Sequence, residues 1–290
     1  YKRQLKALDK VSFSVPKGSI FGLVGANGAG KSTLMRIIAG IYTADDGSVL
    51  INDEPVYDNP AAKTHLVFVP DRMHLTGGGA TIERMANFYA SCYPKFSFEK
   101  FNALLNIFKL DKKRRVRSLS KGMVRQVQTV LALSCNADVL LFDETFDGLD
   151  PIARNIAKRL IYRDMCDFGS TVILTSHSLR ELEDTCDRFA MLYQGKIVFQ
   201  NDLADAKSQL FKVQLAFARQ VTPEDFKDVE LLSFTKQGSI VYVLVRGEAA
   251  ETSAKIEALK PLIMDMLPLS IEEVFTYELS SLGYNFDEIK

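Results

Sequence analysis

The fold of this chain is decided by one stretch, Gly25-Ala26-Asn27-Gly28-Ala29-Gly30-Lys31-Ser32, which fits the pattern G-x-x-x-x-G-K-[ST]. Its glycines allow backbone N–H groups to wrap around phosphate oxygens, and a helix predicted to begin near Lys31 directs its positive end to the same place. Lys31 is expected to neutralise the β- and γ-phosphates of a nucleotide, and Ser32 to hold Mg²⁺. Background residue frequencies give a chance match in about 1% of chains of this length, so the stretch predicts nucleotide binding.

Alternating strand and helix signals surround this loop. Ser19–Val24 predicts a buried strand before it, and the apolar spacing after it predicts a helix that ends near Gly40. The alternation of Val11, Phe13 and Val15 is also typical of a strand. This order favours an α/β fold. Further strands are predicted at Val49–Ile51, Leu66–Val69, Val139–Phe142 and Thr171–Leu174.

A mostly helical insertion interrupts this order over about residues 76–135. Within it, helices are predicted at Thr81–Tyr93, Phe98–Phe108 and Ser120–Cys135. After the next strand, a longer helix over Ile152–Phe168 is predicted to stop near Gly169.

The pattern changes again beyond about Ala206. Val213, Leu215 and Phe217 alternate, and a hairpin is predicted where Leu231–Thr235 and Ser239–Val245 flank a Lys-Gln-Gly turn. A helix at Ala249–Leu259 follows, ending before Pro261. We therefore expect two domains, residues 1–206 and residues 207–290, of which the second is a small accessory α+β domain.

Composition narrows the function classes. The chain has 290 residues with 36 Lys and Arg against 36 Asp and Glu, so the formal net charge is 36 − 36 = 0, which argues against non-specific nucleic-acid binding. No apolar run approaches the roughly 18 residues of a membrane helix. The chain opens at Tyr1 rather than Met, so we expect that a native N-terminal segment is missing or was removed. A reduced, intracellular protein is expected, since the cysteines are widely spaced at Cys92, Cys135, Cys166 and Cys186.

Two carboxylates stand at the end of an apolar strand. Val139–Phe142 is followed directly by Asp143 and Glu144, and in a parallel sheet this end faces the ligand crevice. Adjacent strand residues point to opposite sides, so Asp143 is expected to support Mg²⁺ while Glu144 polarises the attacking water. On their own, the two residues are better explained as solvated charges at a strand end, and the phosphate loop upstream reverses that preference.

A third set of residues opens the helix that begins at Ser120. Leu119-Ser120-Lys121-Gly122-Met123 places a good N-cap at a helix start, which is a further anion site. Local sequence alone is satisfied by a capped helix without any ligand.

The ordered set of motifs resembles the ATP-binding subunit of ABC transporters. In that family, a Leu-Ser-Gly-Gly-Gln pattern binds the γ-phosphate of ATP held by the other protomer. This chain departs from it at Lys121 and Met123 but keeps the serine and second glycine as Ser120 and Gly122. The resemblance implies a P-loop NTPase of ABC type over residues 1–206 and a head-to-tail dimer with two ATP molecules at its interface.

The resemblance carries further residues. Gly148–Pro151 is similar to the family's D-loop, and His177 stands where the family places a switch histidine that contacts the γ-phosphate. Tyr1 lies roughly where the family has an aromatic residue that stacks on adenine. The catalytic residues are then expected to be Lys31, Glu144 and His177. The nucleotide is expected to contact Tyr1, Asn27, Gly28, Ala29, Gly30, Lys31, Ser32 and Thr33, with Ser120 and Gly122 supplied by the partner.

One departure concerns the residues after Leu66–Val69. The family has a glutamine there that couples the metal and water to the helical insertion, whereas this chain has Asp71. Asp71 is shorter and charged, and it is expected to reach the metal through a water. The metal residues implied by the resemblance are thus Ser32, Asp143 and Asp71. The nearby run Thr76–Gly79 is interpreted as a flexible connection.

Two other features favour plain structural interpretations. The basic run Lys112–Arg117 has the charge to meet phospholipid headgroups or nucleic acid, but a solvated connection between helices is favoured. The apolar run Pro261–Leu269 suits a partner surface, but a strand or helix packed in the small domain is favoured.

The leading hypothesis is an ATPase that binds ATP with Mg²⁺ and powers a separate membrane permease. The Ser-Lys-Gly-Met signature and the C-terminal extension look most like the ATPase subunits of bacterial ABC-2-type exporters. This implies a homodimer or a paralogous heterodimer at the cytoplasmic face of a bacterial membrane, without nucleic acid. Two alternatives stay open: a soluble ABC ATPase acting on a nucleic-acid or protein machine, and a nucleotide-sensing module.

Overall fold

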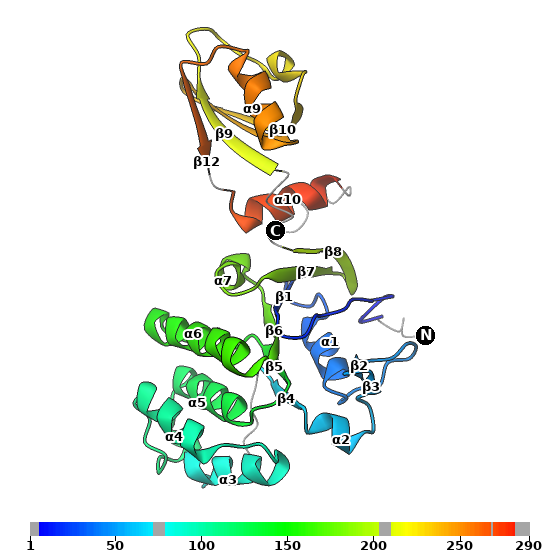
Figure 1. The fold of residues 1–290 in the computed structure, drawn as a ribbon, viewed down its shortest axis with the longest axis vertical. Coiled ribbons are helices and arrows are strands. Elements are labelled where there is room, and N and C mark those ends of the chain that lie inside the picture. The colour runs from blue at the N-terminus through cyan, green and yellow to red at the C-terminus, as the bar shows by residue number, and fades with distance from the viewer. Residues whose placement is uncertain (1–5, 72–78, 203–209, 268, 282–290) are drawn as a thin grey trace. The chain divides into compact units, whose positions relative to one another are not determined.

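The computed structural model in Figure 1 describes residues 6–71, 79–202, 210–267 and 269–281. Its contacts divide the chain into unit 1, Tyr1–Gln200, and unit 2, Asn201–Lys290. Each unit has its own sheet and its own hydrophobic core. Within the described residues, no helix has both the length and the apolar character needed to cross a lipid bilayer.

Unit 1 is built on a sheet in the order β4-β5-β6-β1-β7-β8. The first five of these strands run parallel to their neighbours, and every residue of β1 is buried. Such a sheet needs helices on both faces, which explains why its strands are continuous apolar runs rather than alternating ones. Their bounds are β1 Ile20–Val24, β4 Leu66–Val69, β5 Val139–Asp143, β6 Thr171–Ser176, β7 Arg188–Tyr193 and β8 Lys196–Asp202, beside a small hairpin of β2 Leu50–Ile51 and β3 Glu54–Pro55.

Helices cover both faces of this sheet. Figure 1 shows α1 (Lys31–Ile38) on one side and α6 (Pro151–Phe168) on the other. The helix α6 starts where Asp150 accepts hydrogen bonds from two backbone N–H groups and ends at Gly169, which takes the left-handed conformation at φ 67°. Unit 1 has two further short helices, α2 Pro60–Lys63 and α7 Leu179–Glu183.

The helical insertion is present as predicted. It comprises α3 Ile82–Cys92, α4 Phe98–Ile107, the 3₁₀ turn Val116–Ser118 and α5 Lys121–Ser134. A hydroxyl side chain caps the start of each α-helix, namely Thr81, Ser97 and Ser120. This capping explains why the boundaries could be predicted to within one residue.

One sequence prediction for unit 1 is wrong. Val11, Phe13 and Val15 do not form a strand, although they alternate as predicted. Their side chains are half-buried and pack against the core that contains Phe21 and Leu23. The alternation therefore reports one-sided burial of an extended segment without a hydrogen-bonded ladder.

Unit 2 is an antiparallel sheet with one helix inserted before its last strand. The order β10-β11-β9-β12 and the chain order of its elements match a split β-α-β arrangement in which a 3₁₀ turn replaces the first helix. Its core is mainly aliphatic, with Val213, Leu215 and Val243 buried. The elements are β9 Leu210–Ala216, the turn Pro223–Phe226, β10 Glu230–Gln237, β11 Ile240–Arg246, α9 Ala249–Glu257, β12 Ile263–Leu267 and α10 Ile271–Ser281.

The apolar run near the C-terminus is an edge strand of this sheet. It contains β12, which pairs antiparallel with β9, so the predicted packed strand is present. The side chains of Leu262, Ile263 and Met266 nevertheless remain exposed.

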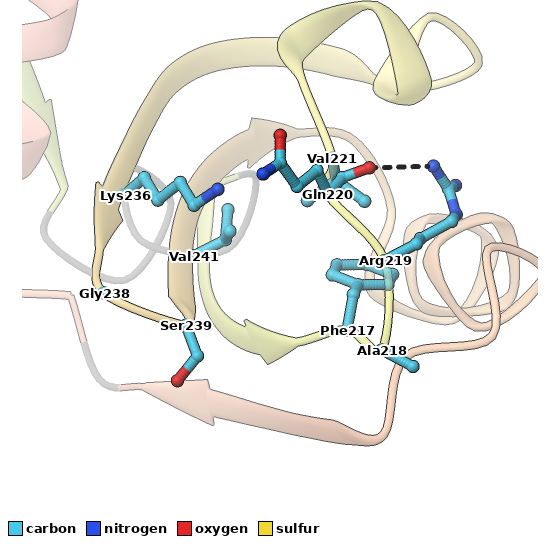
Figure 2. A pocket seen from close by; sticks show the side chains of 9 residues that line it. All are labelled: Phe217, Ala218, Arg219, Gln220, Val221, Lys236, Gly238, Ser239 and Val241. Carbon is cyan, nitrogen blue, oxygen red and sulfur yellow. Dashed lines mark hydrogen bonds between the residues drawn. The ribbon is translucent and has the colours of Figure 1, made fainter.

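A small hollow of about 210 Å³ lies in unit 2 beside the β10–β11 turn, and Figure 2 shows its lining. Phe217 and Val241 form part of its apolar wall, while Arg219 at the rim is already paired with Asp225 at 2.7 Å. Ligand pockets usually measure about 300–1,000 Å³, so this hollow is smaller than most of them. The sequence motifs for nucleotide binding lie in unit 1.

Candidate active site

The glycine-rich loop between β1 and α1 holds a buried lysine at its centre. Lys31 is 5% exposed, and its Nζ donates to the backbone oxygens of Gly25 at 2.5 Å and Ala26 at 3.3 Å. The same Nζ lies 3.2 Å from Oε1 of Glu144. A charged amine is therefore fixed at the start of a helix, at the carboxyl end of the parallel strands.

Glycine is required at two positions of this loop. A Cβ on Gly25 would lie 2.3 Å from the backbone oxygen of Leu192, so no larger residue fits without moving β7. Gly30 adopts φ 109°, and a Cβ there would lie 2.9 Å from the backbone oxygen of Ala7. Close packing on both sides thus fixes the path of the loop.

The other predicted contacts of the loop lie around this lysine. Asn27 and Gly28 are exposed, whereas Ala29 is buried and its N–H donates to the backbone oxygen of Ala26 at 3.1 Å. Ser32 and Thr33 lie half-buried in the first turn of α1.

Asp143 is completely buried at the end of β5. Its Oδ1 accepts a hydrogen bond from the Thr175 hydroxyl at 2.7 Å, and its Oδ2 is buried with no hydrogen-bond partner. The Thr175 oxygen in turn accepts the backbone N–H of Glu144 at 3.0 Å. Thr175 thus ties the two acidic residues to the neighbouring strand β6. Sequence reasoning missed Thr175, because a threonine inside an apolar strand gives no signal of its own.

Glu144 lies between two positively charged or ionisable groups. Its Oε1 faces Lys31, and its Oε2 lies 3.0 Å from Nδ1 of His177. Its backbone takes the left-handed conformation at φ 50°, which is uncommon for a residue other than glycine. The structure therefore brings Lys31 and His177, which are distant in the sequence, to the adjacent carboxylates Asp143 and Glu144.

Ser120 and Gly122 make their contacts at the start of α5. The Ser120 hydroxyl accepts the backbone N–H of Met123 at 3.2 Å, which confirms the predicted N-cap. A Cβ on Gly122 would lie 2.8 Å from the backbone oxygen of Gly148, so this helix start packs against the loop after β5. Lys121 reinforces that contact with an ion pair to Asp147 at 2.6 Å.

The Lys121 hydrogen bond lowers the pKa of Asp147 from its ordinary value. Partial burial opposes this shift, and the charges of Lys121, Arg125 and His177 add to it. Asp147 is therefore held as a carboxylate beside the loop that carries Glu144.

Asp71, the predicted metal contact after β4, is paired with an arginine. Its Oδ1 lies 2.5 Å from Nη2 of Arg125, a side chain that is buried within α5. Sequence reasoning did not single out Arg125, since an arginine in an amphipathic helix is usually exposed. Two other predictions, Tyr1 and most of the run Thr76–Gly79, fall outside the described residues.

The site offers oxygen donors that suit a divalent cation. The buried Asp143 Oδ2 without a partner and the hydroxyl of Ser32 at the loop are oxygen ligands of the type that Mg²⁺ takes. Among the described residues no group of three or more His, Cys, Asp or Glu side chains is arranged to hold a metal by itself. These residues fit a cation that is held mainly by nucleotide phosphates and waters.

A buried strand, a glycine-rich loop, a helix and an acidic strand end facing one lysine define a nucleoside triphosphate-binding protein. Residues 8–147 match the family model described as ABC transporter. The ATP-binding protein YtrB of Bacillus subtilis is 28% identical over 93% of this chain and 92% of its own length. A solved ATP-binding subunit of an ABC transporter is similar with a TM-score of 0.65 and 28% identity, over 71% of this chain and 88% of that one. The chain belongs to the ABC transporter family, as one of its ATP-binding subunits.

Relatives of unit 1 are named for both directions of transport. The Nod factor export ATP-binding protein I of Bradyrhizobium diazoefficiens is 35% identical, over 65% of this chain and 63% of its own. The methionine import ATP-binding protein MetN of Protochlamydia amoebophila is 32% identical, over 68% of this chain and 60% of its own. Membership of the family thus establishes ATP binding and hydrolysis as its activity and does not by itself give a direction.

Proposed function

We propose that this chain hydrolyses ATP as a dimer and so powers a separate membrane permease, to which it binds on the cytoplasmic face of a bacterial membrane. Residues 1–206 form the ATPase domain, and residues 207–290 form an accessory domain. The observation that carries the proposal is the contact of Glu144 with both Lys31 and His177, at 3.2 Å and 3.0 Å. An ATPase needs this set of groups at one point, because phosphoryl transfer depends on positioning and charge neutralisation.

Each residue of the site has a distinct task. Lys31 neutralises the β- and γ-phosphates, while the backbone of Asn27–Gly30 encloses them. Glu144 orients the attacking water and accepts its proton, and His177 holds Glu144 in place and contacts the γ-phosphate. Thr33 extends the loop contacts along α1, and Tyr1 stacks on the adenine ring.

Asp143 and Ser32 would hold Mg²⁺, with Asp71 reaching it through a water. When bound, the cation would supply charge neutralisation to the nucleotide phosphates. The unpartnered Oδ2 of Asp143 supports this assignment, since a buried carboxylate oxygen is costly to leave without a partner.

The dimer completes the site. Ser120 and Gly122 at the start of α5 are proposed to meet the γ-phosphate bound by a second protomer, either an identical chain or a paralogue. The amide-rich start of a fourteen-residue helix favours that position for an anion.

Export is the proposed direction of transport. The chain's Ser-Lys-Gly-Met signature and its C-terminal unit resemble ABC-2-type exporters, and a curated relative at 35% identity is named for Nod factor export. The transported molecule is selected by the permease.

The decisive variant is Glu144→Gln, which keeps the shape of the side chain but removes its basicity. We expect ATP affinity to stay within about threefold, hydrolysis to fall at least about 100-fold, and a dimer to persist in ATP. Radiolabelled ATP binding, phosphate release and light scattering measure these three quantities. Undiminished phosphate release by Glu144→Gln would remove Glu144 from its role.

The same variant tests the partner. Tagged Glu144→Gln is recovered with ATP from detergent-solubilised membranes of the source cell, with Lys31→Ala as the matched control that does not form the ATP-bound dimer. A polytopic membrane protein recovered in stoichiometric amount supports the permease. Recovery of only soluble proteins or nucleic acid contradicts it and favours a soluble ATPase. Supplying the transported molecule either outside or inside membrane vesicles then distinguishes export from import.

A further inference from the structure

Arg125 is a charged side chain in an unexpected place. It lies on α5, one and a half turns beyond the Ser120 N-cap, and it is only 1% exposed. Removing a guanidinium from water costs several kcal/mol, so it is tolerated only when its donors are paired. The burial of Arg125 therefore depends on the contacts that its guanidinium makes.

Within the described residues, the hydrogen-bond partners of Arg125 belong to the loop after β4 or to its own helix. Its Nη2 binds Oδ1 of Asp71, and its Nη1 donates to the backbone oxygen of Pro70 at 3.1 Å. Gln128, one turn further along α5, donates to the same Pro70 oxygen at 3.4 Å and accepts from Arg125 at 3.5 Å. Two side chains of α5 therefore hold the loop that leaves β4.

The sheet register places this loop beside the active site. Val69, the last residue of β4, pairs with Phe142, the residue before Asp143. The loop after β4 thus leaves the sheet at the same carboxyl end of the strands as Asp143 and Glu144. The charge of Arg125 also reaches the loop after β5, because it helps to lower the pKa of Asp147.

We infer that the Asp71–Arg125 pair joins the loop after β4 to α5 and so positions Ser120 and Gly122 for the phosphate of the partner protomer. Asp71 then acts through Arg125 as a positioning residue, in addition to or in place of any contact with the metal. This inference rests on the proposed dimeric ATPase. The pair affects the alignment of the two halves of the site, one from each protomer. The residues that contact the phosphate do not set this alignment by themselves.

A double-mutant cycle in the intact chain tests the pair. The variants are Asp71→Asn, Arg125→Gln, the double variant and the conservative Arg125→Lys. We expect each neutral single variant to lower kcat about tenfold. The double variant should also lose about tenfold in kcat, whereas independent residues would give a loss of about 100-fold. Arg125→Lys should recover part of the loss. Arg163→Gln, which removes an exposed ion pair with Asp167 on α6, is the matched control and should leave kcat unchanged.

ATP affinity separates positioning from a general loss of structure. Lys31 and its loop are untouched, so the ATP affinity of Arg125→Gln should stay close to that of the parent while kcat falls, even if the lost buried pair lowers the melting temperature. If affinity, melting temperature and kcat fall together in both Arg125 variants, Arg125 is only structural and the inference is overturned. Single effects that multiply in the double variant overturn it too, because the two residues then act independently.

The Mg²⁺ dependence distinguishes the pair from a metal ligand. If Asp71→Asn raises the Mg²⁺ concentration for half-maximal rate while Arg125→Gln changes neither that concentration nor kcat, Asp71 acts only on the metal and the pair is not the positioning device. Equal Mg²⁺ requirements in both variants support the inference.

Amide hydrogen exchange gives a readout without turnover. In Arg125→Gln, exchange should accelerate in residues 119–124 and in the loop at Pro70–Asp71, with or without ATP. Unchanged exchange there contradicts the inference even if the chain hydrolyses ATP. Faster exchange in a chain whose Glu144→Gln variant still hydrolyses ATP would instead contradict the proposed function while keeping the contact between α5 and the loop.

Discussion

The two units of this protein differ in what they bury. Unit 1 places polar and charged side chains inside, among them Lys31, Arg125, Asp143 and Thr175. In unit 2 the buried side chains are almost all apolar, and Thr252 is the polar exception among its described residues. A buried polar group is expensive unless it is paired or meets a ligand. Unit 1 therefore depends on the pairing of buried polar groups, whereas the described core of unit 2 is held mainly by apolar packing.

The largest effect on unit 1 is expected from removing its buried lysine, Lys31. Lys31→Ala deletes the group that faces both the loop carbonyls and Glu144, so we expect kcat/KM for ATP to fall about 10³-fold. Steady-state phosphate release measures this loss. Lys113→Ala, at an exposed position of the insertion, is the matched control and should match the parent.

The reciprocal experiment acts on unit 2 alone. Leu215→Ala opens a cavity in its aliphatic core and should lower the free energy of unfolding of unit 2 by about 3 kcal/mol. Urea unfolding with hydrogen exchange resolves the two units. Leu262→Ala, at 71% exposure, should change stability by less than about 0.5 kcal/mol. A large loss of ATP affinity in Leu215→Ala would contradict the separation of tasks.

A finer test changes one polar atom inside unit 1. Thr175→Val keeps the volume but removes the hydroxyl that binds Asp143 and the N–H of Glu144. We expect a loss of about 1–3 kcal/mol in stability, together with a lower kcat, because two buried polar groups lose a partner. Thermal unfolding and phosphate release measure both. Thr175→Ser, which keeps the hydroxyl, should recover most of each; equal loss in both variants would show that only packing matters.

The smallest expected effect lies at the surface of the site. The hydrogen bond from Lys121 lowers the pKa of folded Asp147, so it adds stability above the ordinary aspartate pKa of about 4 that is lost as the pH falls through the folded value. Because the pair is exposed, Lys121→Gln should cost less than about 0.5 kcal/mol at pH 7 and a smaller amount at pH 3, where Asp147 is closer to its folded pKa. Unfolding midpoints at the two pH values test this, and a larger loss at pH 3 would reverse the sign.

Local signals explain most of what the sequence predicted. The loop Gly25–Ser32, the strand ending at Asp143 and the Ser120 cap are each encoded within a few neighbouring residues, and the structure has them as predicted. The alternation at Val11–Val15 was misinterpreted, because a half-buried extended segment and a strand share one pattern.

Long-range pairing explains what was missed. Arg125 and Asp71 are 54 positions apart, and neither lies in a pattern that names its partner. Thr175 was hidden for a similar reason, since its two hydrogen bonds join β6 to the end of β5 and exist only once the sheet has formed. Side chains that support a site through tertiary contacts thus leave little trace in a single sequence.

The left-handed backbone of Glu144 has a consequence for laboratory evolution. At φ 50°, glycine or asparagine has a lower backbone strain energy than glutamate, by about 1 kcal/mol. A selection that rewards heat resistance without demanding turnover would therefore drift toward those residues at position 144. Given the role proposed for Glu144, such variants would bind nucleotide but hydrolyse little of it.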